Sequence, residues 1–201
     1  MPDLRRLGTI SLLQVQSASL MRETPVVRLF DPAPLRCCEA LEISSAGAIG
    51  LNAEGQRIVD VHNANHPETR YRGMNTLSFG FDTHLQMMSD RFGRHLTPGC
   101  AGENLIIATE HVIELTDVAA GILIRSVTDV VLTDVMVAEP CAPFARFALQ
   151  RPDLTPTKVK EALQYLGHGI RGFYCRAVVD QPVRIQIGDS VFARIAPSAL
   201  A

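Results

Sequence analysis

The chain alternates short β-branched and apolar runs with Gly, Pro, Asp and Asn, and this punctuation favours a fold built mainly from short strands. We predict strands over residues 9–15, 25–30, 57–62, 104–108, 122–127, 130–138, 173–179, 183–187 and 190–195. Small all-β domains avoid exposed strand edges by closing into barrels. The pattern therefore predicts a mainly β domain, a closed or partly closed barrel with a few peripheral helices.

Two segments break the strand pattern and predict helices. Between Thr76 and Phe92, apolar residues recur at three- and four-residue steps, which is typical of a helix with one buried stripe. The stripe consists of Leu77, Phe81, Leu85, Met88 and Phe92. A second helix should begin after Thr155 as N-cap, with Pro156 at its first position, and end at Gly167.

Near the carboxyl end, the Gly188-Asp189 pair separates the last two strand-like runs, 183–187 and 190–195. A two-residue turn that contains glycine suits a tight β-hairpin. We therefore expect these two runs to pair with each other.

Length and composition predict one domain and exclude several classes of protein. The chain has 201 residues, of which 47% are hydrophobic, so we expect a single domain over 1–201 with its core at about 9–192. A net charge of −2 disfavours nucleic acid as a partner. The longest apolar run, 118–124, is far below the roughly 20 residues that cross a bilayer. Five cysteines without a Cys-x-x-Cys pair favour the reducing cytoplasm.

Cys141 is the first candidate for chemistry. It follows a predicted strand and lies between Pro140 and Pro143, which stiffen the turn and present the thiol at a strand end. A thiolate in that place suits a soft or borderline metal. The alternative is a buried, inert cysteine, which is the commoner fate of a free thiol.

A glycine-rich loop over 98–104 precedes the apolar run at 105–107. Gly99 and Gly102 let backbone N–H groups approach a ligand, so an anion is one candidate occupant and a plain turn is the alternative. Cys100, between these glycines, is a second candidate thiol.

The most polar stretch, 62–75, contains two histidines and two arginines. His62 and His66 are four residues apart, but Pro67 disfavours a helix through them, so a zinc site is not expected. Arg70 and Arg72 form a pair of guanidinium groups suited to phosphate. The alternative is that they form surface salt bridges with Glu68 or Asp60.

Several common chemistries lack their sequence signatures. No Gly-x-Ser-x-Gly elbow, Walker loop or Gly-x-Gly-x-x-Gly fingerprint is present. Only two of the nineteen basic residues are lysines, Lys158 and Lys160, and their spacing directs them to different sides of a helix. We therefore expect no pyridoxal phosphate bound as an aldimine.

Three motifs together resemble the MOSC domain family, named for the carboxyl-terminal region of molybdenum cofactor sulfurases. They are the loop 98–105 with its Gly-Glu-Asn sequence, the Pro140-Cys141 pair, and the 169–174 segment that leads to Gly188-Asp189. The resemblance covers about residues 9–192. One departure is Arg72-Gly73-Met74, where many members carry His-Gly-Gly.

The resemblance implies a MOSC-type β-barrel that binds a molybdenum cofactor of the molybdopterin type, with Cys141 as the metal ligand. It also implies a catalytic role for Cys141, and Glu103 is a further candidate, which would help to protonate or orient a departing oxygen. The candidate cofactor contacts are Arg70, Arg72, Asn75, Gly99, Gly102, Asn104, Arg171 and Tyr174.

Two functions of different classes follow from the resemblance. The first is an oxidoreductase that reduces N-hydroxylated small molecules and takes electrons from a donor protein. The second is a non-catalytic carrier or sulfuration module for the cofactor. Both need the same thiolate and the same anion pocket, so the sequence does not separate them, and it indicates no oligomeric state.

Overall fold

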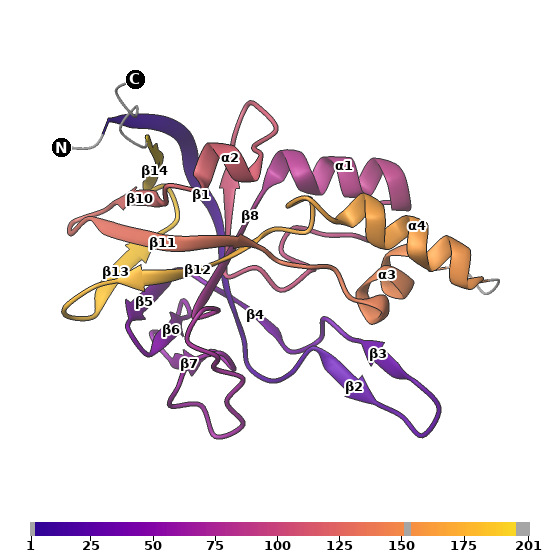
Figure 1. The fold of residues 1–201 in the computed structure, drawn as a ribbon. Coiled ribbons are helices and arrows are strands. Elements are labelled where there is room, and N and C mark those ends of the chain that lie inside the picture. The colour runs from indigo at the N-terminus through magenta and orange to yellow at the C-terminus, as the bar shows by residue number, and fades with distance from the viewer. Residues whose placement is uncertain (1–2, 151–153, 196–201) are drawn as a thin grey trace.

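The computed structural model describes residues 3–150 and 154–195, and a closed β-barrel forms its centre (Figure 1). Seven strands follow one another around the barrel in the order β14-β10-β11-β12-β8-β9-β1, and β14 pairs back onto β1. Their bounds are Leu4–Gln16 (β1), Leu77–Phe81 (β8), Leu105–Ala108 (β9), Ile122–Arg125 (β10), Val130–Val137 (β11), Phe173–Val178 (β12) and Ser190–Arg194 (β14). The predicted mainly β barrel is confirmed.

Strand β1 contacts three neighbours because it bends twice. Its first part pairs with β14, its middle with β9, and its last residues with β4 (Leu35–Cys38). The register shifts between Arg6 and Gly8 and again between Ile10 and Leu12. Bulges of this kind increase strand twist and bending, so one strand both closes the barrel and extends beyond it.

A second sheet and a separate hairpin surround the barrel. The sheet has the order β13-β5-β6-β7, with bounds Val183–Gln186, Ala40–Ser44, Gly47–Leu51 and Arg57–Val59. Leu41, Ile43 and Ile185 of this sheet are fully buried in the barrel core. The hairpin consists of β2 (Met21–Glu23) and β3 (Arg28–Phe30).

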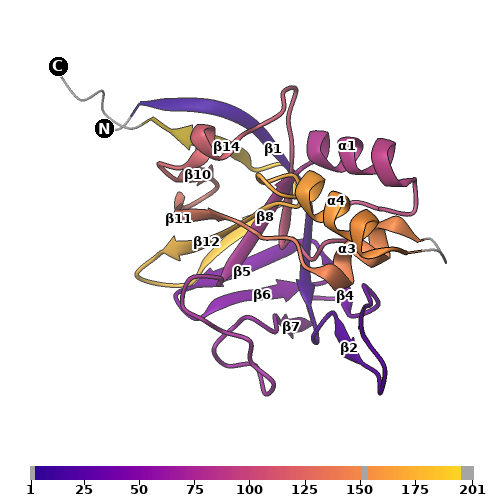
Figure 2. The ribbon, with the colours of Figure 1, turned by 45° about the vertical axis from the view of Figure 1, so that its right-hand side comes forward.

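Three helices gather on one side of the barrel in both views (Figures 1 and 2). They are α1 (Asp82–Phe92), α3 (Ala142–Leu149) and α4 (Pro156–Leu166), while the short α2 (Leu115–Val118) contributes Val118 to the barrel core. A second hydrophobic core forms among them and reaches the hairpin, where the rings of Phe30 and Phe144 are 5.0 Å apart. In the described part of the chain, no helix is long and apolar enough to cross a membrane.

The helix predicted after Thr155 is confirmed. The Thr155 hydroxyl accepts a hydrogen bond from the Lys158 backbone N–H at 3.3 Å, and the helix ends before Gly167. The helix predicted over 76–92 is wrong in its first part, because residues 77–81 form strand β8. Leu77 and Phe81 are four residues apart, and this even spacing also places them on one face of a strand.

The predicted pairing of 183–187 with 190–195 is also wrong. Strand β13 pairs with β5 in the second sheet, whereas β14 pairs with β1 and β10 in the barrel. The turn between them is anchored on β1, where the Gly188 N–H donates to the Ile10 carbonyl at 2.8 Å. The predicted strands at 25–30 and 57–62 are shorter than expected, and form β3 and β7 only.

We expect Gly8→Ala to lower the free energy of unfolding by about 3 kcal/mol, the upper range of overpacking costs. A Cβ on Gly8 would lie 1.7 Å from the Ala108 carbonyl oxygen, a backbone atom of β9 that has little room to move. Urea denaturation measures the loss. Gly55→Ala is the control: no atom lies within 4 Å of its Cβ position, and its positive φ costs about 1 kcal/mol. Equal losses in the two variants would contradict the close β1–β9 pairing.

Candidate functional site

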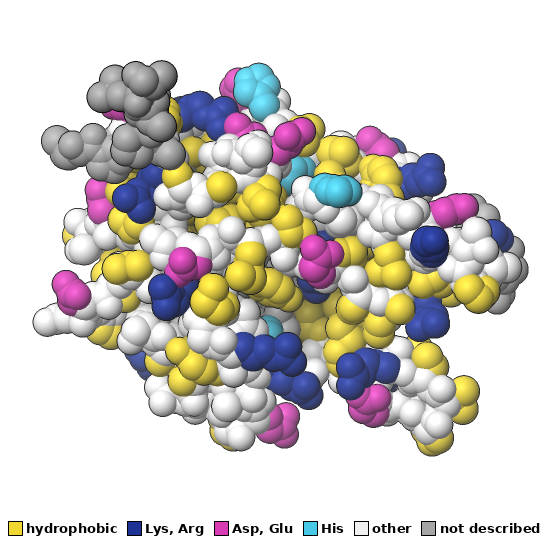
Figure 3. Space-filling view, viewed as in Figure 1, with side chains coloured by type: hydrophobic (Ala, Val, Ile, Leu, Met, Phe, Trp, Pro, Cys, Tyr) yellow, Lys and Arg dark blue, Asp and Glu magenta, His cyan; other side chains and the backbone are white. Residues whose placement is uncertain are grey.

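A cavity of about 480 Å³ opens between the barrel, the β2–β3 hairpin and the start of α3. The space-filling view shows a hollow in this region with basic side chains at its margins (Figure 3). Four arginines line the cavity: Arg28, Arg70, Arg72 and Arg171. Its volume falls within the range of small-molecule and cofactor sites, and its arginines suit an anionic ligand.

Cys141 lines this cavity at the junction between β11 and α3. It is half-buried and is the N-cap of α3, with Pro143 in the first helical turn. The N-terminal end of a helix carries partial positive charge, which favours a negative charge beside it. The sequence predicted the stiffened turn after the strand, but not the helix that begins there.

The other four cysteines lie away from this cavity, and all five belong to the described residues. Burial raises the pKa of Cys38 to about 11 and that of Cys100 to about 12, and it raises the pKa of Cys175 still further. These three thiols therefore stay protonated at neutral pH. Cys37 is exposed on β4. Cys141 is the cysteine placed to bind a ligand in the cavity.

Arg70, Arg72 and Asn75 come together in the 60–76 loop and all line the cavity. The Asn75 side-chain oxygen accepts a hydrogen bond from the Arg72 N–H at 2.9 Å, which shapes the loop. Both guanidinium groups are exposed, and neither forms an ion pair with a described carboxylate. Arg70 and Arg72 therefore do not form the alternative salt bridges with Glu68 or Asp60.

Arg171 and Tyr174 form the inner wall of the cavity. Arg171 is 9% exposed, donates to the Ala101 carbonyl at 3.1 Å, and lies 5.3 Å from the centre of the Phe144 ring. Burial opposes its charge, but interactions with Tyr174, Glu103 and Cys141 raise the pKa of Arg171 above its ordinary value. Arg171 thus stays charged in a place where solvent screens it little.

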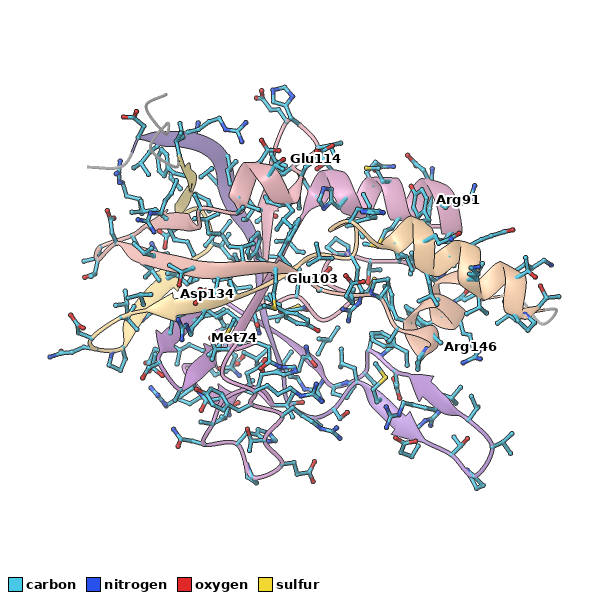
Figure 4. All side chains as sticks on the ribbon, in the orientation of Figure 1. Met74, Arg91, Glu103, Glu114, Asp134 and Arg146 are labelled. Atoms are coloured by element: carbon cyan, nitrogen blue, oxygen red, sulfur yellow. The ribbon has the colours of Figure 1, made fainter. Side chains whose placement is uncertain are left out.

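Glu103 is buried behind this wall, near the middle of the molecule in Figure 4. It lines a separate cavity of about 20 Å³ and does not line the large one. Burial raises the pKa of Glu103 to about 6, although backbone N–H groups and the charge of Arg171 limit the rise. The catalytic role of Glu103 stays a prediction. Glu103 can influence a ligand in the large cavity only through residues that line both cavities, such as Arg171 and Tyr174.

Gly99, Gly102 and Asn104 hold the 98–104 loop against the barrel. The Gly99 and Gly102 carbonyls accept hydrogen bonds from the Gln14 and Gln16 side chains at 2.7 and 2.8 Å. Both glycines have positive φ, and a Cβ on either would lie within 2.7 Å of these glutamine side chains. Gly102 lines the small cavity only, and Gly99 and Asn104 line neither cavity. Their contacts with a cofactor stay a prediction.

The two histidines of the polar stretch have separate partners. His62 Nδ1 lies 3.1 Å from a carboxylate oxygen of Asp60, and His66 Nε2 lies 3.2 Å from the Ser17 carbonyl. Among the described residues, no group of three His, Cys, Asp or Glu side chains is placed to hold a metal ion.

Sequence reasoning missed several residues of the cavity. Arg28 reaches it from the β2–β3 hairpin, and Met136 from β11 next to a bulge, where the positive φ of Asp134 interrupts the register. Gln16, His62 and Glu139 also line the cavity. Glu139 directly precedes the Pro140-Cys141 motif, and the others belong to no motif. The polar stretch at 62–75 could have suggested His62, but no sequence signal pointed to the others.

The fold and the site define a closed β-barrel domain that holds one cysteine at the mouth of a basic cavity. The sequence profile of the MOSC domain matches residues 76–192, and the chain belongs to the MOSC domain family. This family is associated with proteins related to the molybdenum cofactor. No curated protein matches the chain.

Two solved structures share this fold. The YUAD protein from Bacillus subtilis (APC1665) superposes with a TM-score of 0.58 at 14% identity, over 94% of this chain and 97% of that one. A second crystal structure, described as a hypothetical protein, superposes with a TM-score of 0.55 at 12% identity, over 94% of this chain and 68% of that one. At such identities the likeness supports the fold alone.

We expect Asn104→Ala to lower the free energy of unfolding by about 2–4 kcal/mol, because it leaves several buried polar groups without a partner. The Asn104 side chain bonds the Ser78 N–H, the Gln14 carbonyl and a carboxylate oxygen of Asp60. Urea denaturation measures the change. Asn65→Ala, on the exposed loop, should change stability by less than about 0.5 kcal/mol. Unchanged stability in Asn104→Ala, with a loss of bound cofactor, would instead make Asn104 a direct cofactor contact.

Proposed function

We propose that the protein binds a molybdenum cofactor of the molybdopterin type in the 480 Å³ cavity and acts as an oxidoreductase on N-hydroxylated small molecules. One observation carries the proposal: the cavity combines the half-buried Cys141 thiol with four arginines. A soft sulfur ligand and guanidinium groups are what a metal with an anionic, phosphate-bearing organic ligand requires.

The residues fit this cofactor on charge as well as on ligand type. The exposed Arg70 and Arg72 have no carboxylate partner in the described parts of the chain. Arg28 adds a fourth positive charge, although Glu23 pairs with it at 2.6 Å. The guanidinium N–H groups of Arg70 and Arg72 can therefore bind phosphate oxygens without first breaking an ion pair with a described carboxylate.

In this proposal the bound cofactor supplies two-electron redox chemistry. Cys141 anchors the metal, Arg70, Arg72 and Arg28 hold the phosphate, and Asn75 keeps the Arg72 backbone in place. Arg171 and Tyr174 orient the polar end of a small substrate against the inner wall. Met21 and Phe30 of the hairpin form an apolar part of the cavity wall.

The proposal extends to location and partners. We place the protein in the cytoplasm, which the five free cysteines support. An electron-donor protein is required for turnover, and no nucleic acid is involved.

The carrier or sulfuration module is the competing function, and a direct measurement separates it from the oxidoreductase. Protein purified from a host that makes the cofactor should reduce N-hydroxylated bases with an artificial electron donor. Near-stoichiometric molybdenum without such activity would support the carrier.

We expect Cys141→Ser to lose molybdenum while it keeps its fold. Serine has nearly the volume of cysteine but supplies no thiolate, so melting should stay cooperative. Metal analysis of the purified protein and a thermal melt measure the two properties. Cys100→Ser is the matched control, because Cys100 is buried and lies outside the cavity. Loss of metal in Cys100→Ser alone would show that Cys100, and not Cys141, is the metal ligand. Full metal content in both variants would overturn the proposal.

We expect Arg72→Glu to reduce cofactor retention at least about tenfold, since a phosphate loses a charge-assisted pair and faces a like charge. Arg184→Glu is the control, because Arg184 is exposed on β13 and does not line the cavity. Pterin content after gel filtration measures retention in both. Arg151, which the sequence predicts on an outer loop, lies outside the described residues. Equal retention in the two variants would remove Arg72 from the site.

A further inference from the structure

A second, much smaller cavity lies directly behind the wall of the large one. Its volume is about 20 Å³, and four residues, Gln16, Ala101, Arg171 and Tyr174, line both cavities. Glu103 and Ser78 line the small cavity only. A buried water needs a cavity of roughly 10–15 Å³ and two to four polar partners. The small cavity therefore has room for one water and for nothing larger.

Two buried polar atoms of residues that line this space have no hydrogen-bond partner. They are Oε2 of Glu103, whose residue is 5% exposed, and Nε of Arg171, whose residue is 9% exposed. The first atom is an acceptor and the second is a donor. Buried polar groups without a protein partner commonly bond an ordered water, and a single water can serve both of these.

The backbone around Glu103 leaves room for its side chain. A Cβ on Gly80 of β8 would lie 3.3 Å from Glu103 Cγ, and a Cβ on Gly172 would lie 3.3 Å from the same atom. Gly172 also has a φ of +119°, and its Cβ would lie 2.9 Å from the Phe79 carbonyl oxygen. Two glycines from different parts of the chain thus hold open the place of this carboxyl group.

We infer that one buried water joins Arg171 Nε to Glu103 Oε2, and that Glu103 thereby sets the positive charge that Arg171 presents to the large cavity. The Arg171 Nε–H donates to the water, which donates to Oε2. Glu103 touches no ligand and is a positioning residue. An ionised Glu103 offsets the charge of Arg171, and a protonated one leaves that charge free to act on an anion. The inference rests on the proposed function, because it assumes that the large cavity binds an anion.

The ionisable groups around Glu103 define the conditions of the test. Tyr174 faces Glu103 from β12, and Arg171 faces it from the turn before β12. Cys100 interacts with Glu103 from the 98–104 loop. Cys141 interacts with Arg171 from the start of α3. With a pKa of about 6, Glu103 changes charge between pH 5 and 7.5, whereas Cys100, at about 12, stays neutral. The test compares variants at each pH, so that any effect of pH common to all of them cancels.

Sulfate is the probe, because it stays a dianion over this range, and calorimetry measures its dissociation constant. We expect Glu103→Gln to bind sulfate about tenfold more tightly than the wild type at pH 7.5, as removal of a nearby buried negative charge predicts. At pH 5.0 the two proteins should agree within about twofold, because the wild-type carboxyl is then mostly protonated. Glu139→Gln is the control: removal of this exposed carboxylate of the large cavity should have a smaller effect on sulfate binding at pH 7.5, because solvent and salt screen its charge.

A second measurement needs no ligand. In ¹⁵N-labelled wild-type protein, the Arg171 Nε–H resonance should be protected from exchange and should shift with a midpoint near pH 6. Arg171→Lys identifies the resonance. If the wild type binds no sulfate but this shift occurs, the proposed anion cavity fails and the link from Glu103 to Arg171 stands. If the resonance does not follow pH, or if the wild type binds sulfate and Glu103→Gln binds it no more tightly at pH 7.5, the inference is overturned.

Discussion

The buried carboxylate of Asp60 connects the barrel to the loop that carries the site. It is fully buried and accepts hydrogen bonds from the Gln16 N–H, the Asn104 side chain and the His62 N–H, at 2.8, 2.9 and 2.8 Å. These partners come from the end of β1, the entry to β9 and the 60–76 loop. A buried charge is tolerated only when donors surround it, so the three segments are held in one arrangement. The positions of Arg70 and Arg72 depend on that arrangement.

The fold was predictable where the local pattern and the tertiary environment agree. β-Branched runs at 122–127, 130–138 and 173–179 contain strands β10, β11 and β12, because each strand has one face in the barrel core. Strand β8 was misread because Leu77 and Phe81 also fit the helical spacing that continues into α1, although Leu77, Phe79 and Phe81 alternate with Ser78 and Gly80 as in a strand. Strands β5 and β6 were missed because alanine and glycine weaken their pattern.

The site was predictable only where a short motif carries the chemistry. Cys141 and Arg72 lie in segments whose residue types suggest thiolate or anion binding, whereas Arg171 was expected only from the resemblance to a family motif. All three line the same cavity. Arg28 could not be predicted, because the Phe30 contact with Phe144 on α3 brings the hairpin to the cavity across more than a hundred residues of sequence. Asp60 was expected to be a surface ion-pair partner, because the residues next to it in the sequence do not indicate that its carboxylate is fully buried.

The arginines of the cavity differ in depth, and depth decides what each contributes. Arg70 and Arg72 are exposed, so water and salt screen their charges, and they act on an anion mainly through direct hydrogen bonds. Arg171 is buried beside the Phe144 ring, where its charge acts over a longer distance and is costly to leave uncompensated. Glu103 supplies that compensation from inside the barrel. A residue that contacts no ligand in the large cavity can therefore control how strongly the cavity attracts an anion.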